Sequence, residues 1–144
     1  MKSVTLFFLL FTFFFGCKRD KTPPISERLQ KVWIASSVEE GGTVVFTKGS
    51  ASNIKPGYSQ FRLDLSSPTT ASLTEFDANT FVGTWEVTAD GKTLTLKGLS
   101  PQPTGTNGNI SFTIGSVSDQ ELTLTRTTIS LKTGGTLNSY NLTR

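Results

Sequence analysis

The residues best suited to chemistry are carboxylates, because the sequence has no His and a single Cys. Glu75, Asp77 and Asn79 stand at alternate positions, a spacing that can put three side-chain oxygens on one face of an extended chain. Calcium-binding loops use a similar spacing, but they begin with Asp and place Gly sixth. Here Glu75 comes first and Thr80 sixth. We therefore expect a strand end followed by a turn, and no metal site.

Other catalytic patterns are missing as well. Isolated carboxylates such as Asp64 and Glu86 lie on polar strand faces, and hydrolysis requires paired or activated groups. The Gly-containing segment 98–108 lacks the Lys-Ser/Thr ending of a phosphate-binding loop. From Thr22 onward ten basic residues balance ten acidic ones, so the concentrated positive charge that nucleic acid requires is absent. We expect no enzyme, no cofactor and no nucleic-acid partner.

The single cysteine marks the end of an N-terminal leader. A basic start at Lys2 precedes an apolar run over residues 4–15, too short at ~1.5 Å per residue to span a ~30 Å bilayer core as a helix. Gly16 and Cys17 then end the run and resemble the lipobox of bacterial lipoproteins, which implies cleavage before Cys17 and acylation of its thiol. The alternative is an ordinary secretory signal with an incidental Cys.

The residues after Cys17 bear on location. Residues 17–25 form the lipidated N-terminus and a charged, Pro-containing tether. In bacterial lipoproteins, an Asp directly after the acylated Cys implies retention at the inner membrane, but here Lys18 follows Cys17. An acidic run after the Cys implies export to the cell surface in some bacteria, and residues 18–21 are not such a run. We expect an anchor in the bacterial outer membrane, with the periplasmic side preferred over the cell surface. The membrane is then a partner through the lipid, and the oligomeric state stays open.

The rest of the chain, residues 26–144, has the alternating apolar and polar residues and the short turns that are typical of antiparallel strands. The segment 82–98 contains two alternating runs. Trp85 and Val87 lie on one face of the first run, and Leu94 and Leu96 lie on one face of the second, which predicts a hairpin with one apolar face. Asp90-Gly91 between the two runs predicts a two-residue type I′ turn.

Similar runs predict the other elements. These are a helical turn at 26–30 and strands at 31–38, 43–48, 58–65, 71–77, 109–117, 121–130 and 136–143.

Eight or nine short strands joined by turns indicate an all-β antiparallel meander, closed as an up-and-down eight-stranded barrel. The alternative is a two-sheet sandwich with Greek-key connections. The pattern resembles the lipocalin-like domain of small bacterial lipoproteins, through Trp33 after the helical turn and through GTWEVTADGKTLTL (83–96) and ISFTIGSVSDQELTLTR (110–126). This resemblance implies a barrel with a central ligand cavity, and it names no ligand.

Two functions from different classes remain. The first is binding of a small apolar or amphipathic ligand inside the barrel, with Phe61, Trp85 and Phe112 as candidate contacts and the loop 98–108 as a flap over an open end. The second is a structural or interaction protein whose barrel or sandwich is filled by its own side chains. Burial of Trp33 and Trp85 in a core explains these residues without any ligand.

Overall fold

The computed structural model describes residues 22–144, so the predicted cleavage and lipidation site at Gly16 and Cys17 lies outside the described residues. The described part is mostly strand, and none of its helices has the length and apolar character needed to cross a membrane. The elements are α1 Ile25–Leu29, β1 Val32–Glu40, β2 Thr43–Thr47, η1 Pro56–Gln60, β3 Arg62–Asp64, β4 Thr70–Thr74, β5 Thr80–Val87, β6 Thr93–Ser100, β7 Ile110–Val117, β8 Glu121–Arg126, η2 Leu131–Thr133 and β9 Asn138–Thr143.

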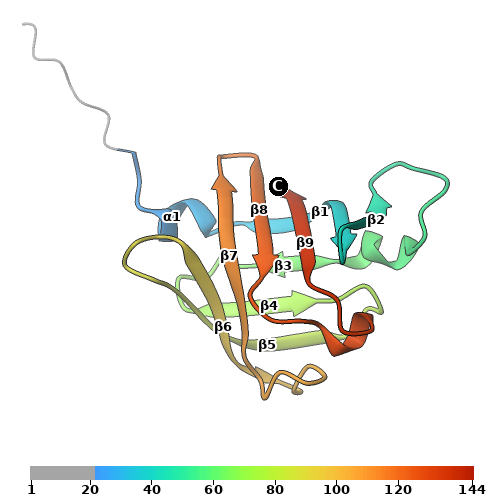
Figure 1. Ribbon diagram of the computed structural model, residues 1–144. Helices are drawn as coiled ribbons and strands as arrows, with labels where there is room; N and C mark the ends of the chain where they lie inside the picture. Colours follow the sequence, from blue (N-terminus) through green and yellow to red (C-terminus); the bar gives the residue numbers. More distant parts are fainter. Residues whose placement is uncertain (1–21) are drawn as a thin grey trace, which may run out of the picture.

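The strands form a closed antiparallel barrel (Figure 1). From β3 to β9 each strand pairs with its neighbour in sequence, and β9 then pairs with β1 to close the ring. β2 and β3 lie end to end along the same edge of β1, so together they occupy one of eight positions. The up-and-down eight-stranded barrel is therefore confirmed, and the sandwich alternative is excluded because neighbouring strands do pair.

The predicted strand over residues 58–65 is wrong in its first half. Tyr58 to Gln60 belong to the 3-10 helix η1, and only Arg62–Asp64 form a strand. Pro56 occupies the start of η1, where its fixed φ and missing N–H favour a helical turn. The alternation of Phe61 and Leu63 is nevertheless real, because both side chains are buried.

The break between β2 and β3 leaves one edge of β2 without a strand partner. Asn53 covers that edge: its side-chain oxygen accepts the N–H of Thr47 at 2.7 Å, and its side-chain nitrogen donates to the Thr47 carbonyl at 3.0 Å. The N–H of Lys55 donates to the Val45 carbonyl at 2.9 Å. Exposed strand edges template aggregation, so this loop protects the fold.

The turn of the central hairpin differs from the two-residue turn expected at Asp90-Gly91. Thr88 still pairs with Thr93, so four residues form the loop, and Gly91 has positive φ (71°) whereas Asp90 does not. The Asp90 carboxylate accepts the Thr88 hydroxyl at 2.6 Å and the Lys92 N–H at 3.1 Å. These side-chain hydrogen bonds stabilise the longer loop. The preference of an Asp-Gly pair for a two-residue turn takes no account of them.

The barrel has two different ends. We call one the helix-covered end, because α1 lies across it: Leu29 is fully buried and its carbonyl accepts the indole N–H of Trp33 at 3.0 Å. The other end is where β1, β4 and β8 finish and β9 begins. Trp85, Leu94 and Leu96 are buried as predicted, and Val87 is half-buried against the core.

Candidate functional site

All five buried polar or charged residues of the described chain gather at the end opposite α1, which we call the polar end. They come from the ends of β1 and β8, from the turn after β4, from the start of β9, and from the connection between β8 and β9. They are Glu40, Glu75, Arg126, Ser130 and Asn138. The barrel interior near the helix-covered end is instead aliphatic apart from Trp33 and Trp85. A buried polar group costs free energy unless it is paired, so this asymmetry identifies the polar end as the candidate site.

Glu40 reaches the interior because β1 carries a bulge. Up to Ala35 the odd-numbered residues of β1 face inward, but the pairing with β9 shifts register between Ala35 and Ser37. After the shift Val38 and Glu40 face inward, and β1 runs to Glu40, two residues beyond the predicted strand 31–38. A bulge inserts one residue into one strand and thereby reverses the facing of the residues beyond it.

The Glu40 carboxylate has two partners. It accepts the ammonium of Lys55 at 2.5 Å and the hydroxyl of Tyr58 at 2.7 Å. Burial, the nearby Tyr140 and the hydrogen bond to Glu40 all raise the pKa of the Tyr58 phenol, so Tyr58 stays a hydrogen-bond donor at neutral pH.

A second cluster joins the β4–β5 turn to the chain beyond β8. The ammonium of Lys132 lies 2.5 Å from Glu75 and 2.7 Å from Asp77. Burial alone pulls the pKa of Asp77 upward, but the hydrogen bond and charge of Lys132 outweigh it, and the pKa falls below its usual value. Burial likewise opposes the charge of Lys132, and its two carboxylate partners raise the pKa overall. Glu75 and Asp77 thus bind a lysine. The Asp77 carboxylate also accepts a 3.2 Å hydrogen bond from the Asn79 N–H, which forms the predicted turn.

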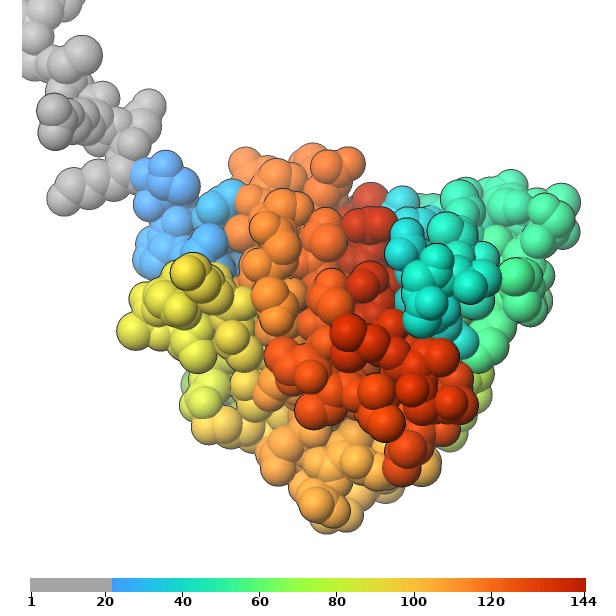
Figure 2. Space-filling model, in the orientation of Figure 1, coloured from blue at the N-terminus to red at the C-terminus, as the bar shows by residue number. Residues whose placement is uncertain are grey.

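Residues 127–137 cover the polar end, and we call them the closing segment (Figure 2). The segment is folded on itself: Ser130 pairs with Thr136, and the Thr133 and Thr136 hydroxyls meet at 2.7 Å. Its contacts with other parts of the barrel include Lys132 and the hydrogen bond from the Gly41 N–H to the Leu137 carbonyl at 3.0 Å.

Beneath the closing segment is a small cavity of about 10 Å³, which suffices for one water molecule. Its walls include Tyr58, Phe61, Phe76, Asn138 and Tyr140. The rings around it are packed together, with Phe61 stacked on Tyr140 at 4.9 Å between centroids and Phe76 5.1 Å from Tyr58. The barrel interior is therefore filled at this end in the conformation described.

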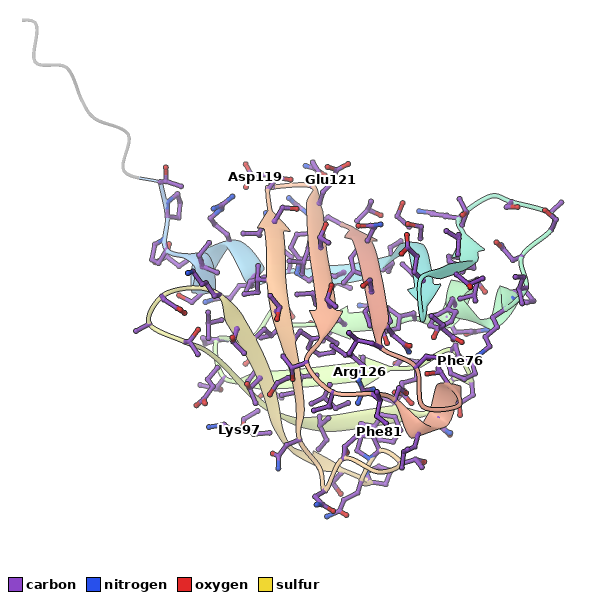
Figure 3. The ribbon with its side chains drawn as sticks, in the orientation of Figure 1. Phe76, Phe81, Lys97, Asp119, Glu121 and Arg126 are labelled. Carbon is purple, nitrogen blue, oxygen red and sulfur yellow. The ribbon has the colours of Figure 1, made fainter. Side chains whose placement is uncertain are left out.

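Arg126 is the last residue of β8 and continues the inward-facing series of Leu122 and Leu124. It is 5% exposed, and Figure 3 shows it at the same end of the barrel as Phe76 and Phe81. Its Nε is the one buried side-chain nitrogen or oxygen within residues 22–144 that lacks a hydrogen-bond partner. No ion pair found in this part of the chain involves Arg126.

The three predicted contact residues are all buried, but they do not lie together. Phe61 and Phe112 flank Tyr140, with centroid distances of 4.9 and 6.0 Å. Trp85 lies towards the helix-covered end, where its indole N–H donates to the Ser67 carbonyl at 2.9 Å. The predicted flap at 98–108 is shorter, because β6 continues to Ser100, and internal hydrogen bonds such as Leu99 N–H to the Gly108 carbonyl (2.8 Å) tie it down.

Sequence reasoning missed Glu40, Arg126 and Asn138. A usable signal existed for Arg126, since its position has the parity of Leu122 and Leu124 and puts a charge on an apolar face. Asn138 shares parity with Tyr140 and Leu142 in the same way. Glu40 had no such signal, because the bulge that turns it inward leaves no mark in the alternation.

Comparison with known proteins supports the fold. No protein-family model matches the sequence. No curated protein matches it. Among solved structures, a lipocalin-like protein from Bacteroides uniformis superposes with a TM-score of 0.51 at 13% identity, covering 81% of this chain and 98% of that one. An uncharacterized protein from Bacteroides eggerthii gives a TM-score of 0.47 at 12% identity, covering 79% and 97%. The chain has a lipocalin-like fold.

Proposed function

We propose that this lipocalin-like barrel is a lipid-anchored protein of the bacterial outer membrane that binds a small amphipathic ligand at its polar end, without catalysis. The observation that carries the proposal is the gathering of all five buried polar residues of the described chain at the polar end, four of them outside the closing segment and Ser130 within it. Apolar residues at these positions would fill a purely structural barrel at lower cost. A ligand with one polar and one apolar part matches an end where polar groups and stacked aromatic rings adjoin.

Ligand entry requires the closing segment to move, because the present cavity of about 10 Å³ is far below the ~300 Å³ of ordinary ligand sites. The segment is suited to moving as a unit, since many of its hydrogen bonds are internal. The ion pairs of Lys132 with Glu75 and Asp77 are the contacts that we expect to break and re-form.

The tether supports an orientation in which the polar end faces away from the membrane. Residue 24 leads directly into α1, at the opposite end of the barrel. Pro24 comes seven positions after Cys17, a stretch that spans at most about 25 Å when extended. With Cys17 acylated, the helix-covered end stays near the bilayer and the polar end opens towards the periplasm.

Mass spectrometry tests both parts of the proposal. The native N-terminus is expected to be an acylated Cys17, and an unacylated chain that starts elsewhere would contradict the anchor. Native mass spectrometry of the protein purified from its own host is expected to show a co-purified small molecule. A protein that carries no such molecule, and whose closing segment shows no opening by hydrogen exchange, would contradict ligand binding.

The second candidate is a filled-barrel interaction protein, and the packed interior favours it. In that case binding occurs on the outer wall, where a surface groove of about 310 Å³ lies between β1 and residues 48–56, with Ile34, Phe46 and Pro56 on its walls. Outward-facing substitutions such as Ile34→Asp would then abolish function in the host, whereas changes under the closing segment would act only through stability.

A further inference from the structure

The guanidinium of Arg126 is unusual because its buried Nε has no hydrogen-bond partner. The buried side chains of Glu40, Glu75 and Asn138 at the same end are all hydrogen-bonded. The polar end holds three cations and three carboxylates, so the charges balance formally. The carboxylates of Glu40, Glu75 and Asp77 are already bound at 2.5 to 2.7 Å by the two lysines. The cluster is therefore neutral overall, but none of these carboxylates forms a hydrogen bond with Arg126.

Keeping such a group inside a barrel is costly. Removal of a cation from water costs several kcal/mol unless hydrogen bonds replace the lost hydration. The position itself does not demand a charge, since Leu122 and Leu124 precede it on the same face and Phe112 stands opposite it on β7. A residue such as Met would fill the space without that cost.

The chemistry of the guanidinium defines what would complete it. Its planar array of donors matches the oxygens of a carboxylate or a phosphate. The rings of Phe112, Tyr140 and Phe61 form a connected aromatic group next to this position, with Tyr140 between the two Phe rings. An acidic head group with an apolar chain attached would therefore meet a cation and aromatic surface together.

We propose that Arg126 binds the oxyanion head group, carboxylate or phosphate, of an amphipathic ligand whose apolar part lies against Phe61, Phe112 and Tyr140. The inference rests on the proposed function, since the ligand enters only when the closing segment moves. The competing explanation is that Arg126 Nε bonds a single ordered water molecule and has no role in recognition.

The test compares three probes of one chain length: octanoate, octyl phosphate and uncharged octanamide. Each is titrated calorimetrically into the mature chain in phosphatidylcholine nanodiscs, with empty nanodiscs as the blank. The variant is Arg126→Met, which keeps an apolar stem and removes the charge. Arg62→Met is the matched control, because Arg62 lies on the outer wall with its side chain half exposed and 3.4 Å from Asp64.

Arg126→Met is expected to weaken octanoate or octyl phosphate binding about 10- to 100-fold, the range for a lost charge-assisted hydrogen bond, while Arg62→Met leaves it unchanged. The stronger of the two acidic probes identifies carboxylate or phosphate as the head group. Arg126→Met is also expected to unfold at the same or a higher urea concentration than the parent, because it removes a buried charge.

Other outcomes distinguish a failure of the proposed role of Arg126 from a failure of the proposed ligand binding. If octanamide binds the parent protein as tightly as both acids, or if Arg126→Met binds the acids undiminished, the role of Arg126 is refuted and ligand binding stands. If no probe binds and nothing co-purifies from the host, the proposed function itself fails. The comparison of probes on the parent protein holds even if Arg126→Met does not fold.

Discussion

Replacing Lys132 with Met is expected to destabilise the barrel by about 2 kcal/mol and to loosen the closing segment. Met keeps an apolar chain next to the rings of Phe76 and Phe81, over which the ammonium lies at 5.7 and 5.4 Å. It removes the charge that Glu75 and Asp77 share. Breaking a fully buried pair costs about 3–5 kcal/mol and an exposed one below about 1. The side chains here are 17%, 11% and 33% exposed, which places the cost between those limits.

The control is Lys97→Met, which breaks an ion pair with Glu86 on the outer wall. Those two side chains are 47% and 59% exposed, so a loss below about 0.5 kcal/mol is expected. Urea unfolding at neutral pH measures both variants. Hydrogen exchange should speed up within residues 127–137 of Lys132→Met while β5 keeps its protection. Equal losses for the two variants would refute the idea that Lys132 holds the closing segment.

The same variant carries a pH signature. The pKa of Lys132 is raised above 10.5 in the folded protein, so its stabilisation is complete below about 10.5 and is lost as pH rises through the folded value. The pKa of Asp77 is lowered below 3.8, so its stabilisation is complete above about 3.8 and is lost as pH falls through the folded value. The stability gap between parent and Lys132→Met should therefore be widest between these limits and shrink on both sides.

Three further outcomes are expected from the structure. Gly83→Ala should cost about 3 kcal/mol in urea unfolding, because the new Cβ would lie 2.3 Å from the Lys97 carbonyl oxygen across a bulge. Tyr58→Phe should cost about 1.5 kcal/mol by the same measurement, because buried Glu40 loses a hydroxyl donor. Cys17→Ser should move the protein from the membrane fraction to the soluble fraction, as measured by immunoblotting.

Each of these has a contrary result. Gly115→Ala is the control for Gly83, since Gly115 also lies at a register shift but its Cβ would come nearest to the Thr123 side chain, at 3.3 Å. Equal costs for the two variants would contradict the argument from the Lys97 carbonyl contact. An undiminished stability of Tyr58→Phe would mean that Glu40 needs only Lys55. Retention of Cys17→Ser at the membrane would refute the lipid anchor.

The parts of the fold that were predictable depend on local alternation. Trp85, Leu94 and Leu96 are inward because side chains alternate along a strand, and Thr-rich outer faces follow from the same rule. The alternation rule assumes that every residue belongs to a regular strand, so it predicts the wrong face beyond a bulge or a helical turn. The bulge in β1 turned Glu40 inward, and the start of a 3-10 helix at Pro56 removed Tyr58 from its predicted strand.

The candidate site was less predictable because it is assembled from chain segments far apart in sequence. Lys132 and Glu75 are separated by 57 positions, and no short motif links them. The sequence predicts Phe61 and Phe112 as bulky inward residues, and they do come together around Tyr140. Trp85 met the same criterion, but the register of β5 places it towards the other end.

The closure between β1 and β9 has a consequence for the order in which the protein forms. Asn141 donates a hydrogen bond to Ser37 across 104 positions, so the first and last strands are partners. Such distant pairing carries a large loop-closure entropy and forms late. The ring therefore stays open until β9 is in place, and loss of β9 deletes a seam of the barrel, leaving β1 and β8 as exposed edges.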